Sequence, residues 1–533
     1  MWPQQYTPVA GSLAWSALVA AVPVFALLVL LGIYRKPAWM ASLVGLVAAA
    51  LVALGVYGMP IDLLLSSIGY GAAYGLFPIG WVVFSAILLY RITLETGKFE
   101  ILKDSIGHLT SDRHQQALLI AFAFGAFIEG AAGFGTPVAV AGAMLAGLGF
   151  SPFYAAGICL LANTAPVAFG SIGTPIIALA TTTGIPLERL SAGVGRICSP
   201  ISLFVPAYLI VVMSGWKGLR SVFPSAAICG LTYAGTQFVV SNFVSAQLTA
   251  ILASLASMGA LIIVIRLGGK QAPSAPGQSR HSAGEILHAW APYALLVVFV
   301  LLWGILPIQR QLNHFSLPFN WPGLHNLIER TPPAVAKAGP YAAVYNFNWL
   351  SASGTACLFA AILAAMVTGL SPRGFFKVLG HTAKQLALAE LTLAGVLALA
   401  FLMNYSGATA TLGLAFAATG ALFPFFSALV GWLGVFLTGS DTSANALFGT
   451  LQVVTANKLG MNPVLMASAN SAGGVMGKMI SLTSIAVAAA ATSMKREDES
   501  LLFRFTLKHS IFLASAIGLI VMFYAYVMPA WAP

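Results

Sequence analysis

Apolar residues fill most of this chain in runs of about 20 residues that are separated by short polar loops. A run of that length is enough for an α-helix to cross the hydrocarbon core of a bilayer. The pattern predicts an all-α, polytopic integral membrane protein with roughly 12–14 transmembrane or re-entrant segments. The runs cover about 14–33, 39–58, 70–90, 124–176, 200–215, 222–240, 246–265, 289–306, 349–370, 386–403, 405–430, 428–450, 463–493 and 510–529.

Three polar segments interrupt the apolar pattern. Residues 91–116 predict an amphipathic helix at the membrane surface. Residues 267–287 are rich in Gly, Pro and Ser, so they predict a cytoplasmic linker between a first transmembrane unit, 1–266, and a second, 288–533. The aromatic and proline-rich segment 307–348 is too long for a simple turn and predicts a cap over one face of the protein.

The apolar run at 124–176 is not explained by a plain spanning helix. It contains Glu129, a cluster of glycines, and the prolines Pro137, Pro166 and Pro175. An ionisable side chain inside a membrane costs about 2.5–3.5 kcal/mol on insertion scales, so it marks a functional site by default. A broken helix is tolerated at that depth only where protein or a water-filled cavity surrounds the freed backbone. We therefore expect this stretch to line a transport pathway.

The second unit contains a weaker copy of this stretch. Interrupted segments that recur in both halves of a chain indicate the substrate site of a secondary transporter. We therefore expect a hairpin and a broken helix at 124–180 and again at 428–490. The matches are GLGFSP at 147–152 with KLGMNP at 458–463, Glu129 with Asp441, and NTAPVAFGSIGTPI from Asn163 with NSAGGVMGKMISLTSI from Asn470.

Composition and charge support a membrane protein. The chain is 59% hydrophobic and only 7% charged, whereas soluble domains carry about 25% charged residues. Its net charge of +11 does not indicate nucleic-acid binding, because most of the 25 Lys and Arg residues lie in short loops between apolar runs. Their distribution follows the positive-inside rule and predicts an N-terminus outside. The four cysteines lie in or beside apolar runs and form no disulfide or metal pattern.

Glu129 and Asp441 are the candidate proton-coupling residues. Each lies inside an apolar run beside a Gly-rich break. A carboxyl group there is neutral when it is protonated and ionised when water reaches it, which suits a proton carrier. The structural alternative is a carboxylate that caps a half-helix or pairs with a cation. A third acid, Glu390, lies near the end of a run and is interpreted as reaching toward the surface.

Candidate substrate contacts follow from the same breaks. A half-helix that begins inside the membrane exposes N–H groups and a partial positive charge, which is a ready carboxylate site. Lys478, the only basic residue deep in an apolar run, either binds an anionic substrate or pairs with Asp441. The hydroxyl groups bind a substrate hydroxyl or their own backbone. The predicted substrate-binding residues are Asn163, Thr164, Ser171, Thr174, Asn470, Ser471, Lys478 and Ser481.

No catalytic or cofactor motif is present. The sequence contains no HExxH, GxSxG or GxGD motif, and its Gly-rich segments lack the GK[ST] of a phosphate-binding loop. The eight histidines lie in loops or at the ends of runs. We therefore expect no enzyme activity, no metal site and no cofactor.

Several long motifs together resemble the L-lactate permease family of bacterial proton-coupled symporters. They occur in order across nearly the whole chain: GAFIEGAAGFGTPVAV, AAGICLLANTAPVAFGSIGTPI, GWLGVFLTGSDTSANALFG, NSAGGVMGKMIS and FRFTLKHS. One position departs from the family pattern, because Leu482 follows KMIS where a proline is expected. Pro175 occupies the equivalent place in the first half, so we expect the second break to be less sharp.

The resemblance implies a fold and a function. The fold would be two inverted repeats, each with a re-entrant hairpin and a broken helix. The function would be symport of L-lactate and related 2-hydroxy monocarboxylates, such as D-lactate and glycolate, with a proton across the bacterial inner membrane. The partners would be these substrates, protons and the lipid bilayer, with no nucleic acid; no oligomeric state follows.

Three alternatives remain open at this point. A sodium-coupled transporter of another small organic anion would contain similar breaks. An intramembrane enzyme would convert its substrate chemically, and a passive channel would equilibrate it without accumulation.

Overall fold

The computed structural model describes residues 1–107, 109–133, 135–267 and 281–532. Among these residues, ten helices are long and apolar enough to cross a membrane. Two further helices, Pro152–Ala162 and Val167–Thr183, are long and apolar enough to cross a membrane if they count as one span, and they meet at a bend of 64°. Two shorter apolar helices, Thr136–Gly147 and Ser353–Val367, bring the number of apolar segments into the expected range. The prediction of a helical, multi-pass membrane protein is confirmed.

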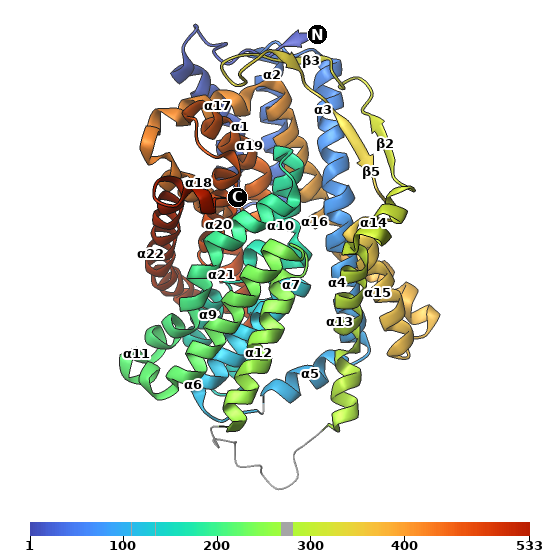
Figure 1. Ribbon diagram of the computed structural model, residues 1–533, viewed down its shortest axis with the longest axis vertical. Coiled ribbons are helices and arrows are strands. Elements are labelled where there is room, and N and C mark those ends of the chain that lie inside the picture. Colours follow the sequence, from blue (N-terminus) through green and yellow to red (C-terminus); the bar gives the residue numbers. More distant parts are fainter. Residues whose placement is uncertain (108, 134, 268–280, 533) are drawn as a thin grey trace.

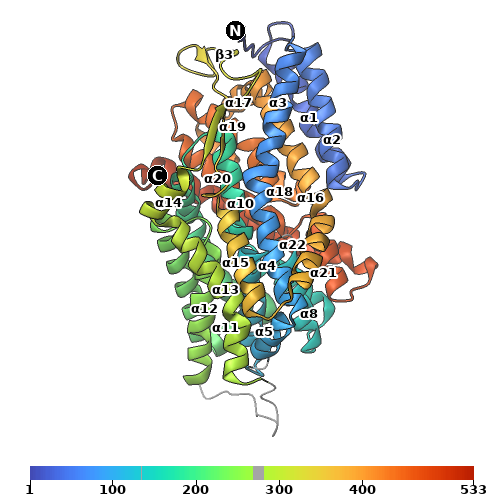
Figure 2. The same ribbon diagram turned by 90° about the vertical axis from the view of Figure 1, so that its right-hand side faces the viewer.

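The helices form two bodies that do not coincide with the two halves of the sequence. In the first body, α3 and α4 pack on α16 and α15, and α13 packs on α5 and α15 (Figure 1). Figure 2 shows this body from its own side, with α16 crossing behind α3 and α4. Its helices are α1 (Leu13–Gly32), α2 (Ala38–Gly55), α3 (Ile61–Tyr74), η1 (Gly75–Gly80), α4 (Trp81–Glu95), α5 (Lys98–Gly107), α13 (Ala283–Gly304), α14 (Leu306–Asn313), α15 (Ser353–Val367), α16 (Pro372–Ser406) and α17 (Ala408–Phe416).

The second body contains both predicted hairpins and both broken helices. Here α10 packs on α19, α11 packs on α20, and α8 and α9 pack on α21. Each half of the chain thus contributes to each body. The elements are α6 (Arg113–Gln116), η2 (Ala117–Phe124), α7 (Gly125–Ala131), α8 (Thr136–Gly147), α9 (Pro152–Ala162), η3 (Val167–Phe169), α10 (Gly170–Thr183), α11 (Leu187–Phe243), α12 (Thr249–Leu267), η4 (Ala417–Leu422), α18 (Phe423–Thr438), α19 (Asp441–Leu459), α20 (Pro463–Lys478), α21 (Leu482–Ala491), η5 (Arg496–Asp498), α22 (Glu499–Tyr526) and η6 (Pro529–Trp531).

Glycines let the helix backbones touch inside each body. Gly75 is the first residue of η1, directly after α3. A Cβ atom on Gly75 would lie 2.6 Å from Ala394 Cα of α16. A Cβ atom on Gly473 of α20 would meet the backbone of Ala428 in α18. Lipid tails are as apolar as Leu, so membrane helices associate through close packing of this kind rather than through the hydrophobic effect.

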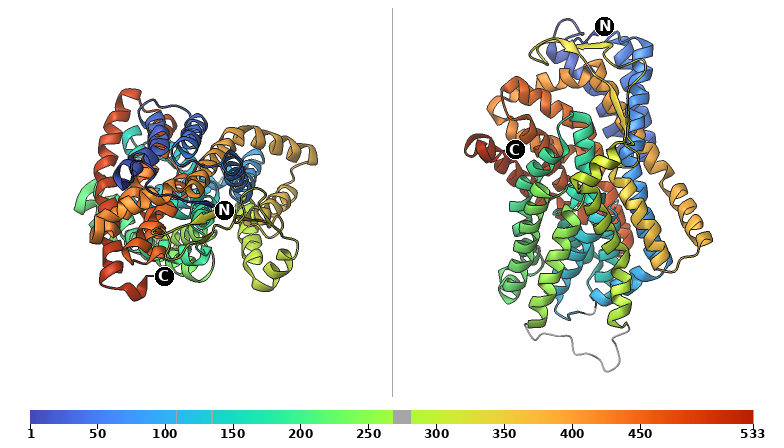
Figure 3. Two further views of the ribbon diagram at one scale, coloured as in Figure 1. Left: turned by 90° about the horizontal axis from the view of Figure 1, so that it is seen from above. Right: turned by 45° about the vertical axis from the view of Figure 1, so that its right-hand side comes forward.

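A small β-structured cap covers one end of the molecule, as the 307–348 segment predicts. Figure 1 shows β3 at this end, near the N-terminus, whereas β2 and β5 run down the side from α3 toward α14; the right-hand view of Figure 3 shows the same arrangement. Tyr70 and Tyr74 of α3 hold the cap by donating hydrogen bonds to the Val344 carbonyl over 3.0 and 3.1 Å. The strands are β1 (Trp2–Pro3), β3 (Ile328–Arg330) and β4 (Gly339–Pro340) in one sheet, and β2 (Leu317–Asn320) with β5 (Val344–Phe347) in another.

The predicted linker 267–287 lies mostly outside the described residues. Its last part is helical, because α13 begins at Ala283. Ser282 and Glu285 form a capping box, in which each side chain bonds the backbone N–H of the other residue. The capping box fixes the helix start, so the second unit begins before residue 288.

Changing Gly473 to Ala is expected to separate α18 from α20. The added Cβ atom has no room, and overpacking costs about 1–3 kcal/mol. We expect a lower midpoint of thermal unfolding for the detergent-purified variant. Gly259→Ala is the matched control, because a Cβ atom on Gly259 of α12 would meet nothing within 4 Å. Equal midpoints for the two variants would show that the α18–α20 contact is not tight.

Candidate functional site

The first hairpin consists of α7 and α8. Its tip uses Gly133 (φ 64°) and Gly135 (φ 81°), because the left-handed region is readily open only to residues without a Cβ atom. Glu129 lies in the last turn of α7 and is 4% exposed. Gly170 leaves room for its carboxyl, since a Cβ atom there would lie 2.7 Å from Glu129 Oε1.

The first broken helix consists of α9 and α10. Near the start of α10 the backbone at Ser171, Ile172 and Gly173 is left-handed, with φ of 44°, 58° and 74°. Non-glycine residues adopt this conformation at a cost, and it persists only where surrounding contacts hold it. The Ser171 hydroxyl donates a hydrogen bond of 2.8 Å to the Ala132 carbonyl at the hairpin tip. Regular helix resumes at Thr174, deep inside the protein.

The second half repeats this plan with a milder break. α18 and α19 form the hairpin around Gly439 (φ 73°), and α20 is followed by α21. Ser481 caps α21 by accepting a hydrogen bond from the Ser484 backbone N–H. Pro463–Ala491 forms a single apolar span of 29 residues despite the break between α20 and α21. By contrast, the first broken helix bends by 64° between α9 and the segment Val167–Thr183. The weaker break expected from Leu482 in place of proline is confirmed.

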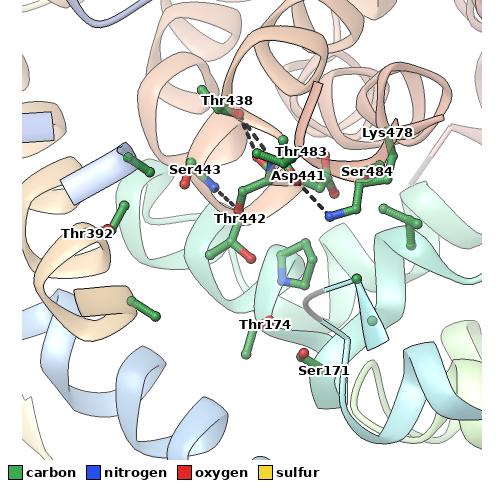
Figure 4. A pocket seen from close by; sticks show the side chains of 18 of the residues that line it. Ser171, Thr174, Thr392, Thr438, Asp441, Thr442, Ser443, Lys478, Thr483 and Ser484 are labelled. Atoms are coloured by element: carbon green, nitrogen blue, oxygen red, sulfur yellow. Dashed lines mark hydrogen bonds between the residues drawn. The ribbon is translucent and has the colours of Figure 1, made fainter. Parts of the chain in front are cut away.

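A cavity of about 260 Å³ lies where the hairpins and broken helices meet (Figure 4). Four helix N-termini reach it: α8 through Gly135, α10 through Thr174, α19 through Ser440 and α21 through Ser484. Thr392 of α16, from the other body, faces them across the cavity in Figure 4. Exposed N–H groups and aligned peptide dipoles make helix N-termini favourable for anions.

Three charged side chains line this cavity: Glu129, Asp441 and Lys478. Lys478 Nζ donates a hydrogen bond of 2.7 Å to the Gly439 carbonyl at the second hairpin tip. Its charge acts on both carboxyl groups. Among the described residues, however, Lys478 forms no ion pair within 4.0 Å of a carboxylate. The ammonium is therefore held by the tip and not neutralised by a partner.

The two acids differ in their surroundings. Asp441 Oδ2 accepts hydrogen bonds from Ser471 Oγ over 2.7 Å and from Asn445 Nδ2 over 3.3 Å. Within the described part of the chain, Glu129 Oε2 is buried without a hydrogen-bond partner, and so is the other oxygen of Asp441, Oδ1. A buried polar atom without a partner carries a free-energy penalty and marks a place where a ligand, water or proton binds.

Comparison with known proteins identifies the family. The L-lactate permease family model matches residues 16–528. L-lactate permease of Bacillus subtilis strain 168 is 44% identical over 97% of this chain and 97% of its own length. Glycolate permease GlcA of Escherichia coli strain K12 is 43% identical over 99% of this chain and 98% of its own length. The chain belongs to the L-lactate permease family.

Among solved structures, this L-lactate permease family member is similar to MtrF of Neisseria gonorrhoeae. The alignment covers 88% of this chain and 85% of that chain, at 14% sequence identity and a TM-score of 0.45.

The predicted site residues of this family member divide into two sets. Glu129, Ser171, Thr174, Asp441 and Lys478 line the cavity. The others lie behind it, where Asn470 bonds Asn445 and Gln452, Ser471 supports Asp441, and Ser481 caps α21. Thr164 bonds its own helix through the Leu161 carbonyl, and Asn163 is buried with both amide atoms unpaired in the described structure.

The two acids do not occupy equivalent places in the repeats. Glu129 precedes its hairpin tip, whereas Asp441 follows its tip as the first residue of α19. Their match in the sequence motifs therefore does not reflect equivalent positions. Different positions explain the different partners of the two carboxyl groups.

Several cavity residues escaped the sequence analysis. Thr438, Thr442 and Ser443 belong to the run TGSDTS, whose density of hydroxyl groups in an apolar segment is a usable signal. Glu390, which the sequence predicts to reach toward the surface, is half-buried. Its Oε1 is buried without a partner among the described residues, and a Cβ atom on Gly80 would meet its carboxyl.

Ser471→Ala is expected to lower the free energy of unfolding by about 1.5–3 kcal/mol, because it removes a hydrogen bond to a buried carboxylate. Denaturant unfolding of the purified protein measures this loss. Ser468→Ala is the matched control one helical turn earlier, since the Ser468 hydroxyl is buried without a partner in the described structure. A Ser471 effect no larger than the Ser468 effect would mean that Asp441 does not depend on this bond.

Proposed function

We propose that this protein is a secondary active transporter that couples proton entry to uptake of L-lactate and related 2-hydroxy monocarboxylates, including D-lactate and glycolate. It would act in the bacterial inner membrane with its N-terminus outside. The proposal rests on the cavity between the two repeats, because this cavity joins four helix N-termini, two carboxyl groups and one ammonium that forms no ion pair in the described structure. Relatives named L-lactate permease and glycolate permease support the substrate class.

The substrate carboxylate fits the cation-rich side of the cavity. Lys478 Nζ and the N-terminus of α21 would attract it, since each places positive charge at the same cavity wall. The 2-hydroxyl group needs a donor or acceptor nearby. Thr174, Thr442 and Ser443 line the cavity and offer hydroxyl groups for that contact.

The charges in the cavity provide a mechanism for coupling. With both carboxyl groups ionised, Glu129, Asp441 and Lys478 sum to one net negative charge, which opposes an anion. A proton on one carboxyl makes the three groups neutral together, so anion binding becomes favourable. By linkage, the bound anion then favours the bound proton to the same extent. Proton and substrate would therefore enter and leave together.

Glu129 is the better proton carrier of the two. Ser471 and Asn445 donate hydrogen bonds to Asp441, and such bonds favour the ionised form. In the described structure each acid has one oxygen without a partner, but Glu129 also lies beside the left-handed break of α10. A change at this break would alter the space around the Glu129 carboxyl directly.

Uptake of labelled L-lactate by proteoliposomes tests the function. We expect accumulation driven by an inward proton gradient, with competition from D-lactate and glycolate, and no change when external sodium is replaced. Sodium dependence would favour a sodium-coupled transporter of another small organic anion. Equilibration without accumulation would indicate a channel, and chemical conversion of lactate would indicate an enzyme.

Glu129→Gln is expected to abolish gradient-driven accumulation but to keep lactate exchange, because Gln resembles the protonated acid and cannot release a proton. Counterflow of labelled lactate in proteoliposomes without a gradient measures exchange and shows that the variant is folded. Asp441→Asn is the matched comparison. It makes the unprotonated cavity neutral, so accumulation is expected to fall, but not to vanish, because Glu129 can still bind and release a proton. If Asp441→Asn uncouples transport and Glu129→Gln does not, the roles of the two acids are reversed.

A further inference from the structure

A second cavity, of about 980 Å³, lies beneath the β-structured cap. Its walls come from α3, α10, α16 and α19 together with cap residues between 330 and 344. The tyrosine side chains in the wall are fixed by the backbone of the cap. Tyr70 and Tyr74 donate to the Val344 carbonyl, and Tyr405 donates to the Ala342 carbonyl over 2.9 Å. The cavity is therefore preorganised and does not need to form around a ligand.

The charge of this second cavity is positive. Arg330 and Lys458 line it, and none of its described lining residues is Asp or Glu. Arg330 lies 5.0 Å above the Tyr341 ring centroid, which orients the guanidinium. Neither cation forms an ion pair within the described parts of the chain. The positive-inside rule assigns most Lys and Arg residues to cytoplasmic loops, on the side opposite the cap. That rule therefore does not account for two cations in a cavity beneath the cap.

The second cavity lies on a path to the central one. Both are lined by α10, α16 and α19. On each of these helices, one residue lines the central cavity and another, eight positions later, lines the second cavity. Eight residues span about 12 Å along a helix, at about 1.5 Å per residue. The pairs are Thr174 with Thr182, Leu393 with Phe401, and Thr442 with Thr450.

Hydrogen bonds connect α10, α16 and α19 at the wall of the second cavity. Thr450 Oγ1 donates to the Thr182 carbonyl over 2.8 Å, and Asn404 Nδ2 donates to Thr450 Oγ1 over 3.1 Å. The C-terminus of α10 would otherwise repel an anion with its carbonyl groups. The Thr182 carbonyl, one of the last four of α10, accepts the Thr450 hydroxyl, which reduces that repulsion.

We propose that the second cavity is an outer anion vestibule that binds the substrate carboxylate through Arg330 and Lys458 before it reaches the central cavity. This inference rests on the proposed function, because it assumes that the transported substrate is a small carboxylate. Two cations in a partly enclosed cavity raise the local anion concentration, and salt weakens that effect.

The double variant Arg330→Gln/Lys458→Gln tests the vestibule in sided transport assays. We expect the KM for L-lactate to rise about threefold to tenfold at low ionic strength when substrate is added on the side of the N-terminus. The maximal rate from the N-terminal side, the KM from the opposite side and gradient-driven accumulation are expected to stay as in the unmodified protein. The maximal rate from the opposite side is expected to fall by the same factor as the KM rises, because Vmax/KM without a gradient is equal in both directions. The rise in KM is expected to shrink as salt is added, because salt screens the vestibule of the unmodified protein.

Arg310→Gln is the matched control, since Arg310 is exposed on α14 and does not line the second cavity. A double variant whose KM and salt dependence equal those of Arg310→Gln overturns the vestibule while leaving lactate transport intact. A rise in KM from both sides also overturns it, because it indicates altered folding or an altered central site. If the unmodified protein accumulates no lactate, the proposed function itself fails.

Discussion

The need to satisfy polar groups inside a membrane governs this structure. Each hairpin tip and each helix break frees backbone groups at a depth where lipid offers no hydrogen-bond partner. The protein places these breaks against one another, so that Ser171 bonds the Ala132 carbonyl and Lys478 bonds the Gly439 carbonyl. The remaining helix N-termini surround a cavity, and an anion is the ligand that such a cavity favours.

The two candidate proton-coupling acids differ in the hydrogen bonds around them. Asp441 and the residues behind it form a continuous buried hydrogen-bond network through Ser471, Asn445, Asn470 and Gln452. On the first-repeat side, Glu129 Oε2 and both amide atoms of Asn163 have no partner within the described structure. The hydrogen bonds to Asp441 Oδ2 oppose its protonation, although Asp441 Oδ1 has no partner within the described structure, and unpaired groups gain from a proton, a water or a substrate. This asymmetry explains why two similar-looking acids have different proposed roles.

Much of the fold was predictable from the sequence. Runs of about 20 apolar residues specify spanning helices because only a helix satisfies its own backbone in lipid. The two interrupted stretches, and the milder break at Leu482, were also visible in the sequence. The cap strands were not expected in an all-α fold, because pairs such as β1 with β3 join residues that are far apart in the chain.

The sequence by itself determined which residue types lie at membrane depth: the acids, Lys478, the glycines and the prolines of the breaks. Only the tertiary structure decided which of them share a cavity. Asn470 and Thr174 look equally suitable in the sequence, yet one is enclosed in a network and the other faces open space. Arg330 and Lys458 lie in separate polar segments and meet only because the cap folds over α19. The physical reason is that a side chain's partners depend on the packing of distant helices, which local sequence patterns do not encode.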